Sequence, residues 1–314
     1  ARCFDFFQGA QTISLPESRR HAAQGFNVMA YILRHDSDKE GQMVGLKRYL
    51  PGGLWLLLVL ALLGHGAVGQ WAHYHDFANQ QAWHGVPNGA DVLSNVGFIV
   101  LGTWGLSWLA QSKRPLWGRA QSGYVLFLVG VLLTGLGSAY YHWQPNNHTL
   151  IWDRLPIALT CAGLLAGARA EIQGVSSRRD VAWWTLWGVL SVAWWAWTAR
   201  AGTGGDLRPY ILLQAAPLWL IPLWLWLYRA PKQLVQPFML AIACYILAKI
   251  AEITDAWLWQ ASGHVISGHT LKHLLATMAV ALMCAHLYRR SHPVECRARR
   301  IARLNAKLGR WPSQ

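Results

Sequence analysis

The stretch that decides the fold is GYVLFLVGVLLTGLGSAYYHWQPNNHTLIWDRLPIALTCAGLLAGAR, residues 123–169. Two runs within it, 123–143 and 150–169, are almost wholly apolar, and a short polar turn separates them. A transmembrane helix needs about 20 mainly apolar residues, so each run is long enough to cross a bilayer. Three side chains that are costly in lipid stand where the two runs meet: Ser138, His142 and Asp153.

The whole chain has the composition of a membrane protein. Of its 314 residues, 54% are hydrophobic and 13% are charged, which is about half the charged fraction of an ordinary soluble domain. Apolar runs of spanning length occur at residues 51–70, 92–110, 123–143, 150–169, 181–199, 210–228, 237–259 and 268–287. We therefore predict an all-α integral membrane protein, a bundle of seven transmembrane helices with one extra hydrophobic helix at its N-terminus.

The net charge of +14 is distributed unevenly along the chain. Of the 28 Lys and Arg residues, 23 fall in five segments that would share one side of the membrane: 1–50, 111–121, 169–180, 229–236 and 288–314. Cytoplasmic loops carry the excess of positive charge, so these loops and the C-terminus are predicted to be cytoplasmic, in a bacterial inner membrane. This distribution argues against nucleic-acid binding, and the sequence indicates no protein partner.

Composition also divides the two ends of the chain from its core. Residues 1–42 are polar, and we interpret them as an N-terminal extension that need not belong to the natural protein. Residues 43–70 have a basic start, an apolar stretch and small residues before Gln70, which is typical of either a signal peptide or an anchoring helix. Residues 71–287 are the predicted seven-helix domain, and 288–314 a basic cytoplasmic tail.

Polar residues from three predicted helices reach one depth in this topology. The 123–143 helix runs outward, so Ser138 and His142 arrive near the periplasmic face, where Asp153 begins the next helix. The last helix starts from the same face with His269 and His273. Residues four apart lie on one helix face, about 6 Å apart along the axis, so each of the two pairs can face a common point.

This arrangement favours a metal site. Two histidines on one helix face and a third from a neighbouring helix are the ligand set of a catalytic zinc site, with the fourth position open. A single intramembrane histidine is more often an interior residue held by hydrogen bonds, but the set of three favours zinc bound by His142, His269 and His273. The alternative is haem b, which needs histidines that face each other across a porphyrin and leaves Ser138 and Asp153 without a role.

Asp153 and Ser138 each have two interpretations from the residues alone. Asp153 is either a helix-start carboxylate paired with Arg154, or a base beside a water at the metal. Ser138 is either a small packing residue in the sequence GLGS, or a hydrogen-bond donor at the site.

At these positions the sequence resembles the alkaline ceramidases and their superfamily, which includes the progestin and adipoQ receptors and the haemolysin III type proteins. The motifs that carry the resemblance are SAYYH (138–142), Asp153 in LIWDRLP, and HTLKH (269–273), within residues 71–287. The resemblance implies a seven-helix core that binds zinc through the three histidines. It also implies that Asp153 transfers the proton of the attacking water, and that Ser138 hydrogen-bonds the water or the oxyanion.

Alkaline ceramidases also carry a calcium site before their first core helix, and the resemblance extends to it weakly. In HDFANQQAWHGVPNGADV, Asp76 matches the leading acidic residue, whereas Asn79 and Gln81 stand where the family has Glu and Asn. Asn88 or Asp91 would be the distal ligand. Fewer carboxylates weaken calcium binding, so the alternative is a polar loop ordered by Asn and Asp turns.

A further charged cluster, AKIAEITDAW, precedes the last helix. Lys249 and Glu252, three residues apart, are expected to form an ion pair, while Glu252 and Asp255 are alternative candidates to orient a ligand histidine. Lys272 lies between the two histidines of the last helix in sequence and is expected to point away from their face.

Two functions remain for such a site. The first is an intramembrane zinc-dependent amide hydrolase that acts on a lipid amide similar to ceramide. The alternative is a receptor-like or binding membrane protein of the same superfamily, in which the zinc is structural and no substrate is turned over.

Overall fold

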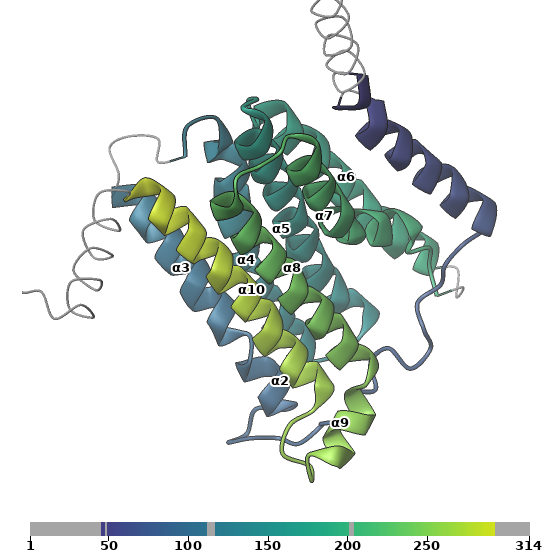
Figure 1. Ribbon diagram of the computed structural model, residues 1–314. Coiled ribbons are helices and arrows are strands. Elements are labelled where there is room, and N and C mark those ends of the chain that lie inside the picture. Colours follow the sequence, from purple (N-terminus) through teal and green to yellow (C-terminus); the bar gives the residue numbers. More distant parts are fainter. Residues whose placement is uncertain (1–44, 48, 112–116, 201–203, 293–314) are drawn as a thin grey trace, which may run out of the picture. The chain divides into compact units, whose positions relative to one another are not determined.

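The computed structural model describes residues 45–47, 49–111, 117–200 and 204–292, which form helices with no β-strand among them (Figure 1). The chain divides into two units, residues 1–50 and 51–314, and the helix bundle belongs to the second. The predicted extension, 1–42, and residues 293–314 of the predicted tail lie outside the described residues.

The described part of the predicted core contains seven long helices. They are α3 (Val96–Gln111), α4 (Gln121–Trp143), α5 (Asn147–Gln173), α6 (Arg178–Ala199), α7 (Arg208–Leu227), α8 (Lys232–Ile253) and α10 (Gly268–Ser291). Three short helices accompany them: α2 (Gly89–Leu93), η1 (Gly118–Ala120) and α9 (Asp255–Ala261). The helix Gly45–His65 precedes the core. Figure 1 shows α10, in yellow, lying between α3 and α8, and it contacts both.

Seven of the described helices are long and apolar enough to cross a membrane, which identifies an integral membrane protein. They are Gly45–His65, Gly89–Gln111, Gly118–Trp143, Asn147–Gln173, Arg208–Leu227, Lys232–Ile253 and Gly268–Ser291. The predicted span 181–199 is present as α6, which has 22 residues but is not among these seven. Its helix contains six tryptophans and begins Arg178-Arg179-Asp180, and both features lower its hydropathy.

The predicted span 237–259 is wrong over its last six residues, 254–259. Helix α8 ends at Ile253, Thr254 leaves the helical region of backbone space, and the separate helix α9 begins at Asp255. The break turns the Asp255 carboxylate toward two other segments of the protein. It accepts hydrogen bonds from the backbone amides of Ala78 (2.9 Å) and His269 (2.8 Å). Apolar residues resume directly after this break, in AWLW (256–259), so the average hydropathy of the run does not show where the helix ends.

Helices α4 and α5 pack with their backbones almost in contact. Glycines 123, 130 and 137 recur every seven residues on α4, which places them on one face of that helix. A Cβ atom on Gly130 would lie 2.6 Å from the amide nitrogen of Thr160, and one on Gly137 would overlap the carbonyl of Trp152. Pro156 has no N–H to offer that carbonyl, so Gly137 can lie directly on it. This contact sets Ser138 against the helix turn that carries Asp153.

A loop carboxylate joins the segment before the core to the loop between α6 and α7. Asp206 accepts hydrogen bonds from the Arg208 guanidinium (2.8 Å), the Trp194 indole (3.0 Å) and the Val68 amide (3.4 Å). Burial by itself would raise the pKa of Asp206, but these donors hold the pKa well below its ordinary value. The carboxylate therefore stays ionised and holds residue 68 against this loop.

Because a side chain at position 137 would separate α4 from α5, we expect Gly137→Ala to lower the free energy of unfolding by about 1–3 kcal/mol. Gly64→Ala is the matched control, since nothing lies within 4 Å of a Cβ atom there. Thermal unfolding in detergent measures both variants. Equal unfolding temperatures for Gly137→Ala and the unmodified protein would contradict the close packing.

Candidate metal centre

The loop between α4 and α5 fixes the entry of α5. Asn146 caps α5: its side chain accepts from the amides of His148 (2.9 Å) and Thr149 (3.0 Å), and the Thr149 hydroxyl in turn accepts from the Asn146 amide (3.2 Å). This reciprocal cap leaves three residues between the two helices, so His142 at the end of α4 and Asp153 in the second turn of α5 are held at one end of the bundle.

The start of α10 is held equally firmly. Ser267 caps the helix by accepting from the Thr270 amide (3.0 Å), and Asp255 accepts from the amide of His269. Gly268 lies against the end of α8, because a Cβ atom there would be 2.6 Å from the Cα atom of Asp255. His269 and His273 therefore begin α10 in fixed positions, one turn apart.

The structure brings His142, His269 and His273 together. All three are buried, and they offer nitrogen atoms that lie within 4.8 Å of one another. The Nε2 atoms of His142 and His269 are 3.2 Å apart, and the three ring centroids lie 4.7–5.0 Å apart in edge-to-face arrangements. Among the described residues, these three histidines are the group of His, Cys, Asp or Glu side chains that lie close enough together to hold a metal ion.

The geometry fits a tetrahedral zinc ion. Two nitrogens bound to zinc at 2.0–2.1 Å with a tetrahedral angle are about 3.3 Å apart, close to the observed separation of the two Nε2 atoms. The Nδ1 atom of His142 is buried and has no partner among the described residues, and the hydrogen bond of its Nε2 atom is to His269, another histidine of the group. The haem alternative does not fit, because rings with centroids under about 5 Å apart leave no space for a porphyrin between them.

The neighbours of His273 fix which of its nitrogens is free. The Ser94 hydroxyl donates its one proton to the Asp91 carbonyl (3.1 Å), so its oxygen accepts from Nδ1 of His273 (2.8 Å). Nδ1 therefore carries the ring proton, and Nε2 presents a lone pair. This is the arrangement by which second partners orient histidine ligands to metals.

Lys272 contacts His269, so the expectation that it points away from the histidines is wrong. Its Nζ atom is 2.7 Å from Nε2 of His269 and 3.1 Å from Oε1 of Glu252. An ammonium group can only donate, so Nε2 of His269 accepts and carries a lone pair. A metal ion bound through that lone pair would replace the contact with Lys272, which would keep its bond to Glu252. Residues three apart on a helix are neighbours, and the long lysine side chain bridges the remaining angle.

Phe77 covers the histidines from the loop before α2. Its ring centroid is 4.7 Å from that of His142 and 4.5 Å from that of His269, and the side chain is buried. The Asp255 carboxylate holds the next residue, Ala78, by its amide. The aromatic ring therefore separates the two imidazoles from the loop side of the molecule.

Ser138 and Asp153 line the same cavity as His273 and are both buried. Oδ1 of Asp153 has no partner among the described residues. Arg154 does not form the expected pair with Asp153: its guanidinium lies 4.0 Å from the centroid of Trp195, and Tyr74 and Tyr210 flank it at 5.2 and 5.5 Å. An aromatic cage thus holds the arginine charge, and Asp153 has no ion pair with Arg154.

The five residues considered for calcium are engaged within the protein in different ways. Asp76 pairs with His73 at the surface (2.8 Å), and Asn79 accepts from the amide of Gln81 (3.0 Å). Asn88 donates to the carbonyl of His142 (2.8 Å), and the buried Asp91 accepts from the Thr270 hydroxyl (2.6 Å). Asn88 and Asp91 therefore brace the ends of α4 and α10, and calcium binding remains a prediction.

Glu252 and Asp255 both reach His269, by different routes. Asp255 accepts from its backbone amide, whereas Glu252 contacts Lys272, which contacts the ring. The expected pair of Lys249 and Glu252 is present, with a distance of 2.7 Å. Sequence reasoning missed Ser94 and Phe77, since neither stands in a motif of metal-binding residues.

A cavity of about 210 Å³ extends into the bundle from His273, the one histidine of the three that lines it. The ends of helices nearest the site line it with polar groups, namely Ser138, Asp153, Lys249, Glu252, Lys272 and His273. Farther along the same helices and α7 the lining is apolar, with Phe127, Ile221, Phe238 and Met283. His273 and Met283 are ten residues apart on α10, so the cavity extends about 15 Å along that helix.

Comparison with known proteins adds no relative. No protein-family model, no curated protein and no solved structure matches the chain.

The three histidines are expected to bind one metal ion together. We expect the zinc content of the purified protein to be about one per chain, and to fall to background in His142→Ala, His269→Ala and His273→Ala. His148→Ala is the matched control, because His148 is an exposed histidine at the same end of the bundle. Metal analysis by mass spectrometry checks this, and unchanged zinc in the three variants would exclude the site.

Ser94 is expected to act on the metal through His273. Ser94→Ala should weaken zinc affinity about 10–100-fold, because Nδ1 of His273 loses the partner that fixes its tautomer. Ser94→Thr should restore most of the affinity, and Ser107→Ala, which removes a hydroxyl bonded within α3, should leave it unchanged. Competition with a zinc chelator measures the three affinities.

Proposed function

We propose that this protein is an intramembrane zinc-dependent hydrolase of lipid amides, related to the alkaline ceramidases. The observation that carries the proposal is the cluster of three buried histidines, of which His273 lines the polar end of a cavity that is apolar farther in. Ser138 and Asp153 line the same end, as the motifs of that family would require. Zinc is the proposed metal because the ligand set is three imidazoles.

The metal would be held by Nε2 of His142, His269 and His273. When bound there, zinc polarises the amide carbonyl and makes water a better nucleophile near neutral pH. The remaining steps belong to residues of the chain.

Asp153 is the proposed proton carrier. Its Oδ1 atom is buried and unpartnered, so it can accept a proton from the attacking water and later return it to the leaving amine nitrogen. Ser138 lies on the facing helix turn, where its hydroxyl can donate to the oxygen of the tetrahedral intermediate. Hydrolysis then releases a fatty acid and a free amine.

The apolar part of the cavity suits the acyl chain. It is lined by side chains from six long helices, and its extent of about 15 Å along α10 accepts an acyl chain of about a dozen carbons. Phe77 covers the histidines on the loop side, so few water molecules would reach the amide bond of the substrate from there. We place this polar end at the periplasmic face, following the charge distribution of the loops.

The test is hydrolysis measured together with metal content. The full chain in detergent or lipid nanodiscs, supplied with zinc, should release fatty acid from ceramides or from N-acyl amides. Asp153→Asn should lower kcat by about 10²–10⁴-fold while zinc content stays at one per chain, because proton transfer is lost and the ligands are intact. Thr160→Val, which alters another polar side chain of the cavity on α5, is the matched control.

The outcomes separate the two proposed roles. Stoichiometric zinc with no turnover of any amide would overturn the hydrolase and favour a binding protein with structural zinc. Turnover that survives Asp153→Asn would remove Asp153 from the reaction.

A further inference from the structure

Two lysines share one carboxylate beside the histidines. Lys249 donates to Oε2 of Glu252 (2.7 Å), and Lys272 donates to Oε1 (3.1 Å). Each oxygen of Glu252 is therefore occupied by a different ammonium group. Two ammonium groups and one carboxylate give the three side chains a net charge of +1.

The surplus charge lies inside the cavity. Lys249, Glu252 and Lys272 all line it; the side chains of Lys272 and Glu252 are 18% and 22% exposed, and that of Lys249 is 40% exposed. The other carboxylate of the cavity, Asp153, belongs to the helix pair α4–α5 and is assigned to proton transfer. A charge in such an apolar setting is costly unless an opposite charge joins it.

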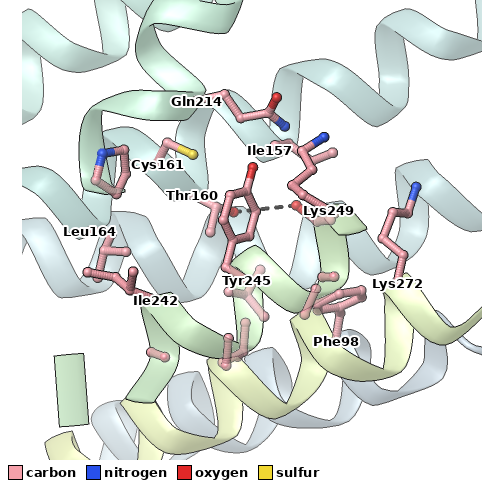
Figure 2. Close-up of a pocket in the computed structure, with 18 of the residues that line it drawn as sticks. Phe98, Ile157, Thr160, Cys161, Leu164, Gln214, Ile242, Tyr245, Lys249 and Lys272 are labelled. Atoms are coloured by element: carbon pink, nitrogen blue, oxygen red, sulfur yellow. Dashed lines mark hydrogen bonds between the residues drawn. The ribbon is translucent and has the colours of Figure 1, made fainter. Parts of the chain in front are cut away.

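The cavity wall also contains a buried hydroxyl group without a hydrogen-bond partner. The Tyr245 hydroxyl is buried and unpartnered among the described residues, and it stands on α8 one turn before Lys249. Figure 2 shows the tyrosine ring in the middle of the lining, with Lys249 and Lys272 on α8 and α10 beside it. The wall thus offers two cations and a hydroxyl where the apolar lining ends.

We propose that the amine portion of the lipid amide carries a carboxylate next to the scissile bond, so that the substrate class is the N-acyl α-amino acids. This inference rests on the proposed function for the identity of the bond that is cleaved. Lys272 binds the carboxylate: its Nζ atom contacts His269, and a metal bound at Nε2 of that histidine would leave the ammonium group bonded to Glu252, with donors available for a ligand next to the site. The α-carboxylate of an N-acyl amino acid is one carbon away from the amide nitrogen, so the two groups can be bound together.

Lys249 has a different part in this arrangement. By pairing with Glu252 it offsets that carboxylate and leaves the charge of Lys272 available to the ligand. Lys249 is a positioning residue, while Lys272 contacts the substrate. Glu252 orients both ammonium groups.

The test compares three ligands with the same acyl chain. N-dodecanoylglycine carries the carboxylate next to the amide, N-dodecanoyl-6-aminohexanoate carries it several carbons away, and N-dodecanoylethanolamine is neutral. Binding is measured on the full chain in nanodiscs after removal of metal with a chelator, so that turnover does not interfere. We expect the glycine derivative to bind about tenfold more tightly than the other two, the size expected of one charge-assisted hydrogen bond.

Charge variants decide which residues cause the preference. Lys272→Met should abolish it, and Lys249→Met should reduce it, because Glu252 then neutralises Lys272 alone. Glu252→Gln should increase it, since two lysines are then uncompensated. Thermal unfolding of each variant shows that the fold is retained.

The two proposals can fail separately. Equal affinities for the three ligands, or a preference that survives Lys272→Met, would overturn the carboxylate site whether or not amides are hydrolysed. Absence of hydrolysis of every amide by the zinc-loaded protein would overturn the proposed function, while the binding series would still report on the carboxylate site.

Discussion

A polar side chain inside a bilayer is stable only when another polar group lies within reach, and this constraint governs how the helices assemble. Helix α10 illustrates it at both ends. At its start, Thr270 bonds to Asp91 and His273 to Ser94, which ties α10 to α2 and the residues that follow it. At its other end, His286 and Arg290 pair with the buried Glu171 of α5, which also accepts from Tyr124 of α4. The polar groups thus fix the register of α10 against α4 and α5.

The close contact of α4 with α5 is the second interaction that positions the histidines. Glycines at seven-residue intervals allow the two backbones to meet, and the packing needs no polar group. His142 and Asp153 come from this pair, whereas His269 and His273 come from α10. The site therefore forms where an apolar contact and a polar contact are both satisfied. Neither contact alone would place the three imidazoles within reach of one ion.

The sequence predicted the histidine cluster because helical spacing carries the information. The i, i+4 interval puts His269 and His273 on one face, and hydropathy places His142 at the matching depth. The break at Thr254 was not predicted, because apolar residues resume at 256–259 and give the run its spanning length even though Glu252 and Asp255 interrupt it. Arg154 was expected to pair with its sequence neighbour Asp153, yet tertiary packing offers it three aromatic rings from distant segments. Ser94 and Phe77 reach the histidines through chain segments whose positions depend on the whole bundle.

The seven-residue recurrence of glycine on α4 was readable in the sequence and could have predicted the contact with α5. At position 272, by contrast, helical spacing gave the wrong prediction. Helical spacing placed Lys272 off the face of the two histidines, but a long side chain covers more than the spot above its own Cα atom. Glu252, one turn from Lys249 on the neighbouring helix, determines where the ammonium group lies. The direction of a long side chain follows from its partner, and the partner is known only once the helices are packed.

The charges of the site set its chemistry as a group. Lys249 and Lys272 are both paired with Glu252, and among the described residues neither forms an ion pair with Asp153, so one ammonium charge has no direct partner of its own before any metal is bound. A divalent cation at the histidines adds two positive charges at a depth where water screens them weakly. Asp153 is the carboxylate with an unpartnered oxygen, while Glu252 is already shared by two lysines. This difference gives the two carboxylates different tasks. Asp153 is available to move a proton, and Glu252 keeps the lysines in place at the end of the cavity where an amide head group would lie.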